Sequence, residues 1–248
     1  MSRQGKSTVQ LVDFSLPTTP GNLALDQWLL DTVDSGAPSP GWLRLWENPV
    51  PAVILGRSSR FDEEVNPSAC RDEGVEICRR VSGGAAVVIG PGCLMYSLVL
   101  DTRIHPQLKM LDQTHRYVMS RIGDALARCG VTSRFQGTCD LTVDDRKVSG
   151  NSLRCTRNAL LYHGTLLYGF PIGLIGRLLE TPPRQPEYRR GRRHEQFVTN
   201  LPVEPEMLRR ALQAVWQATP VDTPLIDRKA IAALERERYS RQSWTRSR

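Results

Sequence analysis

The chain has 248 residues, 40% of them hydrophobic, and carries a formal net charge of +7 at pH 7. This length and hydrophobic content suffice for a packed core, and the positive charge suits an anionic ligand or an acidic partner. The N-terminal residues MSRQGKSTVQLVDF lack the charged-then-apolar pattern of a secretory signal, and no apolar run is long enough to cross a bilayer. We therefore expect a cytoplasmic protein that does not enter a membrane.

The first half of the chain predicts two helices and four strands. Residues 22–35 have the apolar spacing of an amphipathic helix, with Asn22 placed to cap its N-terminus. A second helix is expected at 63–74, ending at Gly74. Short strands are expected at four places, with a turn at Gly83 and Gly84 between the last two: 41–48, 51–59, 75–81 and 85–100.

The second half begins with a long helix from Gln113 to Cys129, which Gly130 ends. Strands follow as an antiparallel meander with an Asp-Asp turn, at 141–143, 146–150 and 159–169. Further helices are expected at 171–180, 204–218 and 227–240, and 181–193 has the composition of a linker. The predicted fold class is α+β, with a central mixed, mostly antiparallel sheet flanked by helices.

Lys147 lies in the segment DLTVDDRKVSGNS, between RRVSGGAAVV, which begins at Arg79, and LLYHGTLLYG, which begins at Leu160. A lone ammonium on a strand, beside small residues that let backbone amides approach a phosphate, suits an anionic acyl donor. The pattern indicates an acyl-activating or acyl-transferring enzyme. For an isolated lysine, a solvent-facing strand position would be the better explanation.

Seven segments, in their order and spacing, resemble the lipoate-protein ligase A and octanoyltransferase family of the biotin/lipoate ligase superfamily. The segments are PGNLALDQ, LWENPVPAVILGRSSRFDEEVN, RRVSGGAAVV, CDLTVDDRKVSGNS, YHGTLLYG, FVTNL and YSRQSW. The resemblance runs from about Gly21 to Trp244. It implies a class II aminoacyl-tRNA synthetase/biotin ligase-like catalytic domain at 21–248, after an N-terminal segment at 1–20. The C-terminal accessory domain of many bacterial ligases is expected to be absent.

The resemblance implies a lipoate-protein ligase that uses ATP and Mg²⁺ to activate lipoate or octanoate as an acyl-adenylate. The acyl group would pass to a lysine of an apo lipoyl domain or of a glycine-cleavage H-like protein, with a separate accessory subunit as a further partner. The alternative is an octanoyl or lipoyl transferase that works from acyl carrier protein, or between carrier proteins, through a cysteine thioester. Biotin ligase is disfavoured because its usual glycine-rich loop has a different sequence.

The family motifs imply roles for individual residues. Lys147 would bind carboxylate and α-phosphate oxygens and stabilise the charge that grows on them. Arg80, rather than Arg79, would contact phosphate, since alternate strand residues face opposite sides of a sheet. Asp140 would bind the magnesium ion. The other expected substrate- and nucleotide-binding residues are Ser82, Gly83, Gly84, Ala85, Ser149, Gly150, Asn151, His163 and Gly164.

Structural roles compete with several of these assignments. The two glycines also suit an ordinary hairpin turn, and His163 is equally well explained as a packed strand histidine that makes no contact with a ligand. Ala85 replaces a third glycine of the ligases. Ile89-Gly90 and Gly92-Cys93 replace their polar pairs, so nucleotide or metal contacts made there in the family need not occur here.

Six cysteines are spread without a Cys-x-x-Cys pair, which argues against a zinc site or a disulfide framework: Cys70, Cys78, Cys93, Cys129, Cys139 and Cys155. Cys139 and Cys155 lie nearest to the lysine motif and are the candidates for an acyl-thioester. Neither has the cysteine setting of a transferase, and buried apolar thiols also explain both. The ligase is therefore the leading hypothesis.

A non-catalytic module that binds RNA or DNA phosphates is the remaining rival. Its basis would be a cluster of four arginines, Arg189, Arg190, Arg192 and Arg193. Aromatic residues do not alternate with these arginines as they do in single-strand platforms, so we expect no nucleic-acid partner. In a ligase the cluster would instead cover the adenylate phosphate or meet an acidic carrier surface.

Overall fold

The computed structural model describes residues 9–182, 185–221 and 226–248. Part of the expected N-terminal segment and two residues of the expected linker at 181–193 fall outside these ranges. The central sheet consists of β1 (Gln10–Asp13), β2 (Trp42–Trp46), β6 (Cys93–Asp101), β7 (Arg134–Gln136), β8 (Asp140–Val143), β9 (Arg146–Cys155), β10 (Ala159–Leu167) and β11 (Thr219–Pro220). Their order is β11-β1-β2-β6-β10-β9-β8-β7. In this sheet the β1–β11 and β1–β2 pairs are parallel and the other pairs of described strands are antiparallel, which confirms the mixed, mostly antiparallel sheet.

A second, smaller sheet contains β3 (Ala52–Leu55), β4 (Glu76–Arg79) and β5 (Val87–Ile89), in the order β4-β3-β5. The prediction of one strand over 85–100 was wrong, because β5 and β6 belong to different sheets. Gly92 makes the break: its φ is +85°, and a Cβ there would lie 2.3 Å from the Gly169 carbonyl carbon. Only glycine permits this approach.

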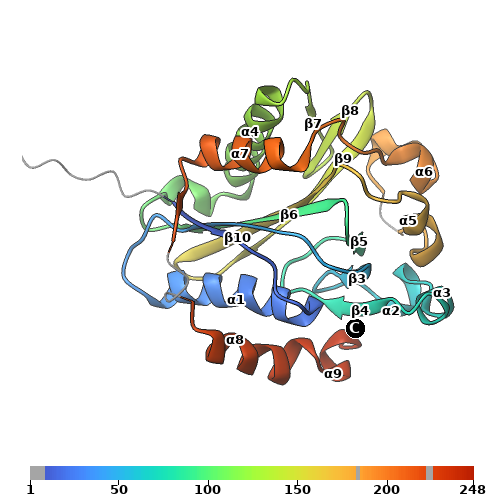
Figure 1. Cartoon of the computed structure of the whole chain (residues 1–248), viewed down its shortest axis with the longest axis horizontal. Helices are drawn as coiled ribbons and strands as arrows, with labels where there is room; N and C mark the ends of the chain where they lie inside the picture. The colour runs from blue at the N-terminus through green and yellow to red at the C-terminus, as the bar shows by residue number, and fades with distance from the viewer. Residues whose placement is uncertain (1–8, 183–184, 222–225) are drawn as a thin grey trace, which may run out of the picture.

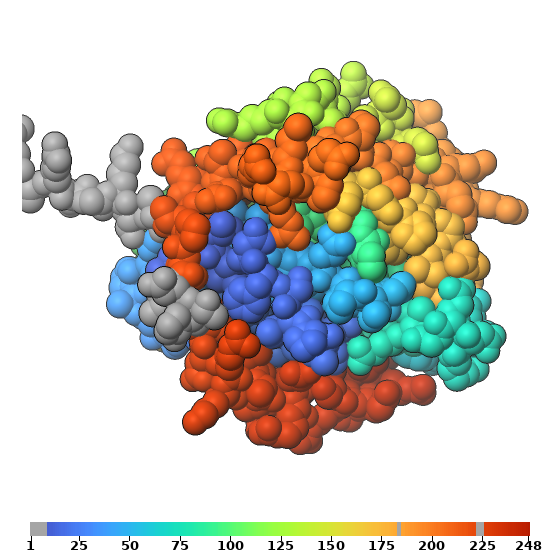
Figure 2. Space-filling view, in the orientation of Figure 1, coloured from blue at the N-terminus to red at the C-terminus, as the bar shows by residue number. Residues whose placement is uncertain are grey.

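Helices cover both faces of the central sheet (Figure 1). α1 (Thr19–Ser35) packs on one face, while α4 (Leu111–Arg128) and α7 (Pro205–Trp216) cover the other. The remaining helices are α2 (Phe61–Glu64), α3 (Pro67–Asp72), α5 (Gly173–Leu178), α6 (His194–Phe197), α8 (Arg228–Leu234) and α9 (Gln242–Thr245), with a π-helical turn at Glu235–Tyr239 and 3₁₀ turns at Pro106–Lys109 and Glu187–Arg189. α8 and the π-helical turn lie along the outer side of α1, and α9 packs on β4 (Figure 2). No helix in the described ranges has the length and apolarity to span a bilayer.

Two helix predictions need correction. Thr18, not Asn22, caps α1, because its side chain accepts from the Gly21 amide, and Asn22 lies buried inside the helix. The helix expected at 63–74 is broken into α2 and α3 before Pro67. A residue that precedes proline avoids helical backbone angles, and Asn66 instead caps the second helix.

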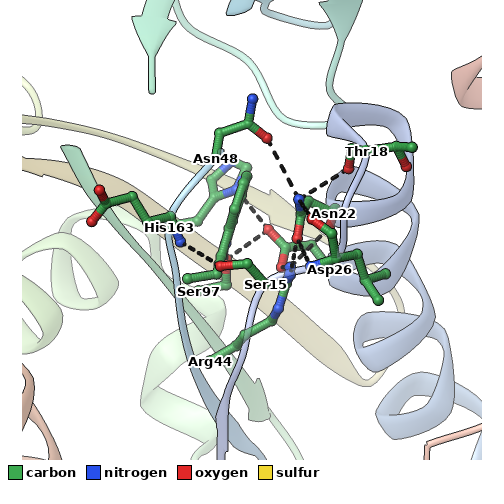
Figure 3. Close-up of polar contacts among 11 residues, drawn as sticks. Ser15, Thr18, Asn22, Asp26, Arg44, Asn48, Ser97 and His163 are labelled. Atoms are coloured by element: carbon green, nitrogen blue, oxygen red, sulfur yellow. Dashed lines mark hydrogen bonds and ion pairs between the residues drawn. The ribbon is translucent and has the colours of Figure 1, made fainter. Parts of the chain in front are cut away.

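A polar network lies where α1 meets the central sheet (Figure 3). Arg44 of β2 is fully buried and donates to Asp26 Oδ1 at 2.6 Å and to the Asn22 carbonyl at 2.8 Å. Asp26 Oδ2 accepts from Ser97 of β6 at 2.6 Å and lies 3.7 Å from His163 Nδ1 of β10. Burial raises the pKa of Asp26, but Arg44 and the hydrogen bonds from His163 and Ser97 lower it below its ordinary value. One carboxylate therefore joins α1 to three strands.

Removal of this carboxylate tests its contribution to stability. Asp26→Ala leaves Arg44 buried without its anion, so we expect the free energy of unfolding in urea to fall by about 3–5 kcal/mol. The double variant Asp26→Leu/Arg44→Met should lose less than the sum of the single losses. As a control, Glu206→Gln in the exposed Arg210–Glu206 pair should change it by less than about 0.5 kcal/mol. A loss below about 1 kcal/mol in Asp26→Ala would contradict the assignment.

The histidines make stability depend on pH. Burial lowers the pKa of all four below the ordinary value: His105, His115, His163 and His194. Below about pH 6.5 the unfolded chain takes up protons that the folded chain excludes, so the free energy of unfolding falls as the pH falls. His163→Gln should show a shallower fall between about pH 7.5 and 5 than the wild type. If the free energy of unfolding fell with pH equally in His163→Gln and in the wild type, His163 would not be held neutral in the folded protein.

Candidate functional site

A cavity of about 380 Å³ lies between the central sheet and the small sheet. Its apolar lining comes from β2, β3, β5, β6 and α1: Leu23, Trp46, Ile54, Val87, Ile89 and Met95. Charged and polar groups at β8 and β9 line it as well, among them Asp140, Lys147 and Ser152. Since β2 and β9 are three strands apart, the apolar end and the polar end are separated by roughly 14 Å. The cavity therefore suits an elongated molecule with one apolar and one charged end.

Most residues selected from the sequence come together at this cavity. Those that border it are Arg80, Gly84, Ala85, Cys139, Asp140, Lys147, Gly150, Asn151, His163 and Gly164. Ser82, Gly83, Ser149 and Cys155 are not among its lining residues. The ordered motifs thus predicted the proximity of most of these residues.

A β-bulge in β9 decides the direction of the Lys147 side chain. Thr142 of β8 pairs with Lys147, whereas the preceding Leu141 pairs with Ser149, so Val148 is an extra residue in β9. Val148 packs with Leu141 in the core beneath α4 and α7. Strict alternation would put Lys147 on the same side as Ser149, which faces Leu141. The bulge instead turns Lys147 to the cavity.

The Lys147 ammonium lies 2.8 Å from Asp140 Oδ1, and the lysine side chain is 27% exposed. It rests over Gly150, where a Cβ would come within 2.8 Å of Nζ. The other Asp140 oxygen accepts from the Tyr188 hydroxyl at 2.7 Å. The Thr199 amide donates to the Lys147 carbonyl at 2.9 Å. Backbone and side chain of the lysine are therefore both held, and the ammonium remains accessible from the cavity.

Arg80 borders the cavity, and most of its donors bond protein groups. Its guanidinium is buried and donates from Nε to Ser82 Oγ at 3.0 Å, from Nη1 to the Ile54 carbonyl at 3.0 Å, and from Nη2 to the carbonyls of Gly83 and Ala85. Burial lowers the pKa of Arg80 to about 10. These acceptors use most of the N–H donors of Arg80. Arg80 therefore shapes the diglycine turn, and few of its donors remain for a ligand.

The diglycine turn itself agrees with the prediction. Gly84 has a φ of +83° and borders the cavity. Within the described part of the chain, the amides of Gly83, Gly84 and Ala85 have no hydrogen-bond acceptor and are free for ligand oxygens. The next amide, of Ala86, donates to Glu64 Oε2 at 2.7 Å, which fixes the end of the turn.

His163 borders the cavity. Its Nε2 contacts Ser82 Oγ, and its Nδ1 faces Asp26. Burial lowers the pKa of His163, although Asp26 opposes this shift, so the ring is neutral near pH 7. It therefore links the network under α1 to the Arg80 turn.

Asn151 borders the cavity, and its side-chain amide is held by protein groups. Its Oδ1 accepts from the Tyr96 hydroxyl, and its Nδ2 donates to the Cys139 carbonyl at 2.8 Å and to Ser149 Oγ at 3.0 Å. A Cβ on Gly164 would lie 1.8 Å from Asn151 Oδ1. The glycine of the His-Gly pair is therefore required by the packing of this amide.

The two candidate thiols differ in position. Cys155 is exposed at the end of β9 and lies outside the cavity lining. Cys139 borders the cavity, and its thiol donates to the Asn151 carbonyl at 2.7 Å. Burial, and then the nearby Asp140 carboxylate, raise the pKa of Cys139 above its ordinary value. The thiol near the lysine is therefore protonated at neutral pH, which makes it a poor nucleophile.

Asp140 was expected to bind magnesium. Among the described residues, no group of three or more His, Cys, Asp or Glu side chains is arranged to hold a metal. A magnesium ion that enters with nucleotide phosphates needs only one or two protein carboxylates. Asp140 supplies one at the polar end, where its oxygens already bind Lys147 and Tyr188. The residues fit an ion carried in by a ligand and do not form a preformed cage.

The arginine cluster is only partly exposed. Arg189 is buried, with its guanidinium 4.9 Å from the centre of the Phe197 ring. Arg192 donates to three backbone carbonyls and lies 5.4 Å from the same ring. Arg190 and Arg193 are exposed. Two of the four arginines thus stabilise their own segment, and two face solvent.

Two residues at the site were missed from the sequence. Asp26 lies one helical turn after Asn22 on the buried face of α1. A carboxylate at a buried position needs a buried partner, and this requirement was the signal that the sequence offered. Tyr188 had no local signal, because its partner Asp140 is 48 residues away in the chain.

Sequence comparison gives a direct family match. The family model described as the lipoyl protein ligase A/B catalytic domain matches residues 19–213. A lipoate-protein ligase A homologue of Aeropyrum pernix is 34% identical over 210 residues, which cover 82% of this chain and 74% of that protein. The lipoate-protein ligase LplJ of Bacillus subtilis is 30% identical over 149 residues, which cover 59% of this chain and 42% of that protein.

Solved structures share the fold, which confirms the predicted architecture. A Thermoplasma acidophilum lipoate protein ligase with bound lipoic acid has a TM-score of 0.78 at 19% identity, with 97% of this chain and 100% of that chain covered. A bipartite lipoate protein ligase from the same organism, described with its E2 lipoyl domain, gives 0.77 at 20% identity over 97% and 96%. A lipoate-protein ligase A bound with ATP gives 0.74 at 19% identity over 96% and 98%. Together with the family match, this cavity, with its lysine and diglycine turn, identifies the chain as a member of the lipoyl protein ligase A/B catalytic domain family.

Proposed function

We propose that this chain is a lipoate-protein ligase that activates lipoate, or octanoate, with ATP and transfers the acyl group to a lysine of a lipoyl domain. One observation carries the proposal: the cavity is apolar at β2 and β6 and presents the Lys147 ammonium at β9. A medium-chain acid placed along it has its hydrocarbon part in the apolar end and its carboxylate at Lys147. The relatives named for lipoate ligation support this substrate class.

The polar end suits formation of an acyl-adenylate. A carboxylate oxygen attacks the α-phosphorus of ATP, and pyrophosphate leaves. Lys147 stabilises the negative charge that accumulates on the oxygens around this bond, and the free amides of Gly83, Gly84 and Ala85 provide neutral donors for phosphate oxygens. Magnesium bound with the nucleotide would lie near Asp140 and offset further phosphate charge.

The same charged group stabilises the transfer step. The amine of the carrier lysine attacks the acyl carbonyl, a carbon–nitrogen bond forms, and AMP leaves with the electrons of the broken carbon–oxygen bond. Lys147 again lies beside the oxygens that gain charge. Because the mixed anhydride is already activated, neither half-reaction requires a cysteine nucleophile. The protonated Cys139 and the distant Cys155 therefore favour the ligase over the transferase.

The acyl acceptor is proposed to be an apo lipoyl domain, in line with the archaeal ligase described with its E2 lipoyl domain. A glycine-cleavage H-like protein offers the same kind of lysine and is the second acceptor. Arg190 and Arg193 are the exposed arginines that can attract an acidic carrier surface, since Arg189 and Arg192 pack inward. We assign catalysis to a domain at 21–248, with a separate accessory subunit as a further partner for transfer.

The first test measures both steps with the chain itself. Incubated with ATP, Mg²⁺ and lipoic or octanoic acid, the protein should release pyrophosphate, and an added apo lipoyl domain should gain one acyl group by intact-mass analysis. Lys147→Ala should lower the rate of pyrophosphate release at least about 100-fold, the range for loss of one transition-state charge contact. Lys229→Ala, at an exposed lysine of α8, is the matched control and should leave the rate unchanged. Acylation only from acyl carrier protein, without any use of ATP, would establish the transferase instead.

The second test concerns the thiols. If no acyl-cysteine forms, Cys139→Ser and Cys155→Ser, alone or together, should keep ATP-dependent acylation within about threefold of the wild type. Hydroxylamine treatment of the enzyme after incubation with substrates should release no acyl group. An acyl-enzyme seen by mass spectrometry and lost in one of these variants would overturn the adenylate mechanism.

A further inference from the structure

The Tyr188 hydroxyl makes the only side-chain hydrogen bond in the described residues that joins the segment 185–193 to the Asp140 carboxylate. Its distance of 2.7 Å is close to that from the Lys147 ammonium to the other Asp140 oxygen, 2.8 Å. The phenol therefore donates to the carboxylate that holds the lysine.

Tyr188 belongs to a strap, defined here as residues 185–200, that crosses the polar end of the cavity. Gln185 and Pro186 line the cavity directly. The Tyr188 ring packs 5.2 Å from the Phe197 ring, centre to centre. Beyond Phe197, the Thr199 amide bonds the Lys147 carbonyl. The strap is thus attached to β9 at its far end by backbone, and nearer its start to Asp140 of β8 by the phenol and to the Asp145 carbonyl by Arg192 Nη1 at 3.0 Å.

Asp140 has to serve two partners. An anionic ligand that approaches Lys147 competes with Asp140 for the ammonium, and a carboxylate released from one cation needs another donor to stay in place. The Tyr188 hydroxyl is that donor. Without it, Asp140 is free to rotate with Lys147 away from the cavity, and the start of the strap loses its bond to β8, while Arg192 Nη1 still donates to the Asp145 carbonyl.

We propose that Tyr188 is a positioning residue, which acts through Asp140 to hold the Lys147 ammonium at the cavity and to fasten the strap over the polar end. This inference rests on the proposed function for its kinetic consequence, but its mechanical part does not depend on any activity. Tyr188→Phe removes one oxygen and keeps the ring on Phe197. Tyr168→Phe is the matched control, because that hydroxyl also donates to a carboxylate, Glu47, at 2.7 Å, and Tyr168 does not line the cavity.

Limited trypsin digestion tests the mechanical part, since the strap carries the exposed Arg190 and Arg193. In Tyr188→Phe, cleavage after these arginines should be about tenfold faster than in the wild type, relative to cleavage after the exposed Arg60. Tyr168→Phe should match the wild type. Asp140→Ala, which removes the acceptor, should accelerate cleavage similarly, and the double variant with Tyr188→Phe should add little, because the two groups act through one bond. Equal rates in Tyr188→Phe and the wild type, or additive effects in the double variant, would overturn the proposal.

The kinetic part separates positioning from a general loss of structure. Tyr188→Phe should lower the single-turnover rate of pyrophosphate release about tenfold at saturating ATP and change the KM for ATP less than about threefold. A change in KM alone would refute positioning of Lys147. If the wild type releases no pyrophosphate with either acid, the proposed function fails, and the digestion experiment still decides whether Tyr188 fastens the strap.

Discussion

The buried pair between Arg44 and Asp26 is the constraint on which the rest of the site depends. Desolvation of two charges is costly, so the pair persists only because further donors surround the carboxylate. Those donors come from different strands of the central sheet, and this arrangement fixes where α1 crosses them. His163 faces Asp26 and contacts Ser82, and Ser82 accepts a hydrogen bond from Arg80. Arg80 in turn donates to the carbonyls of the diglycine turn. The position of the turn amides is thus set by the network around Asp26 of α1 and Arg44 of β2, which lies outside the turn.

A second constraint acts from the opposite side of the cavity. The extra residue in β9 turns Lys147 inward, and Asp140 and the 185–200 strap keep it there. The cavity therefore has the amides of the diglycine turn on one side and the Lys147 ammonium on the other. Donors held in place before the ligand arrives need no reorganisation as charge develops, which is the physical basis of electrostatic catalysis.

The same preorganisation explains the distribution of roles among the polar residues. Most donors of Arg80 and the side-chain amide of Asn151 bond protein groups, so both residues serve as supports, whereas Lys147 and the turn amides retain donors that no described residue uses. Cys139, beside a carboxylate and half-buried, has its thiol stabilised in the neutral form. Charge on the substrate is therefore met by fixed cations and amides, and covalent chemistry on the enzyme is disfavoured at this position.

The sequence by itself determined whatever depends on neighbouring residues. Amphipathic spacing located α1, α4 and α7, the diglycine turn follows from backbone freedom, and the ordered motifs placed Lys147 among the residues of one cavity. Local signals competed at Thr18 and Asn22, and before Pro67, where the helix boundaries were misplaced. Only the tertiary structure decided the bulge at Val148, the separation of β5 from β6, and the partners of Arg80, Asn151 and Tyr188. These depend on strand pairing and on which buried donors meet which acceptors, and both are settled between segments that lie far apart in the chain.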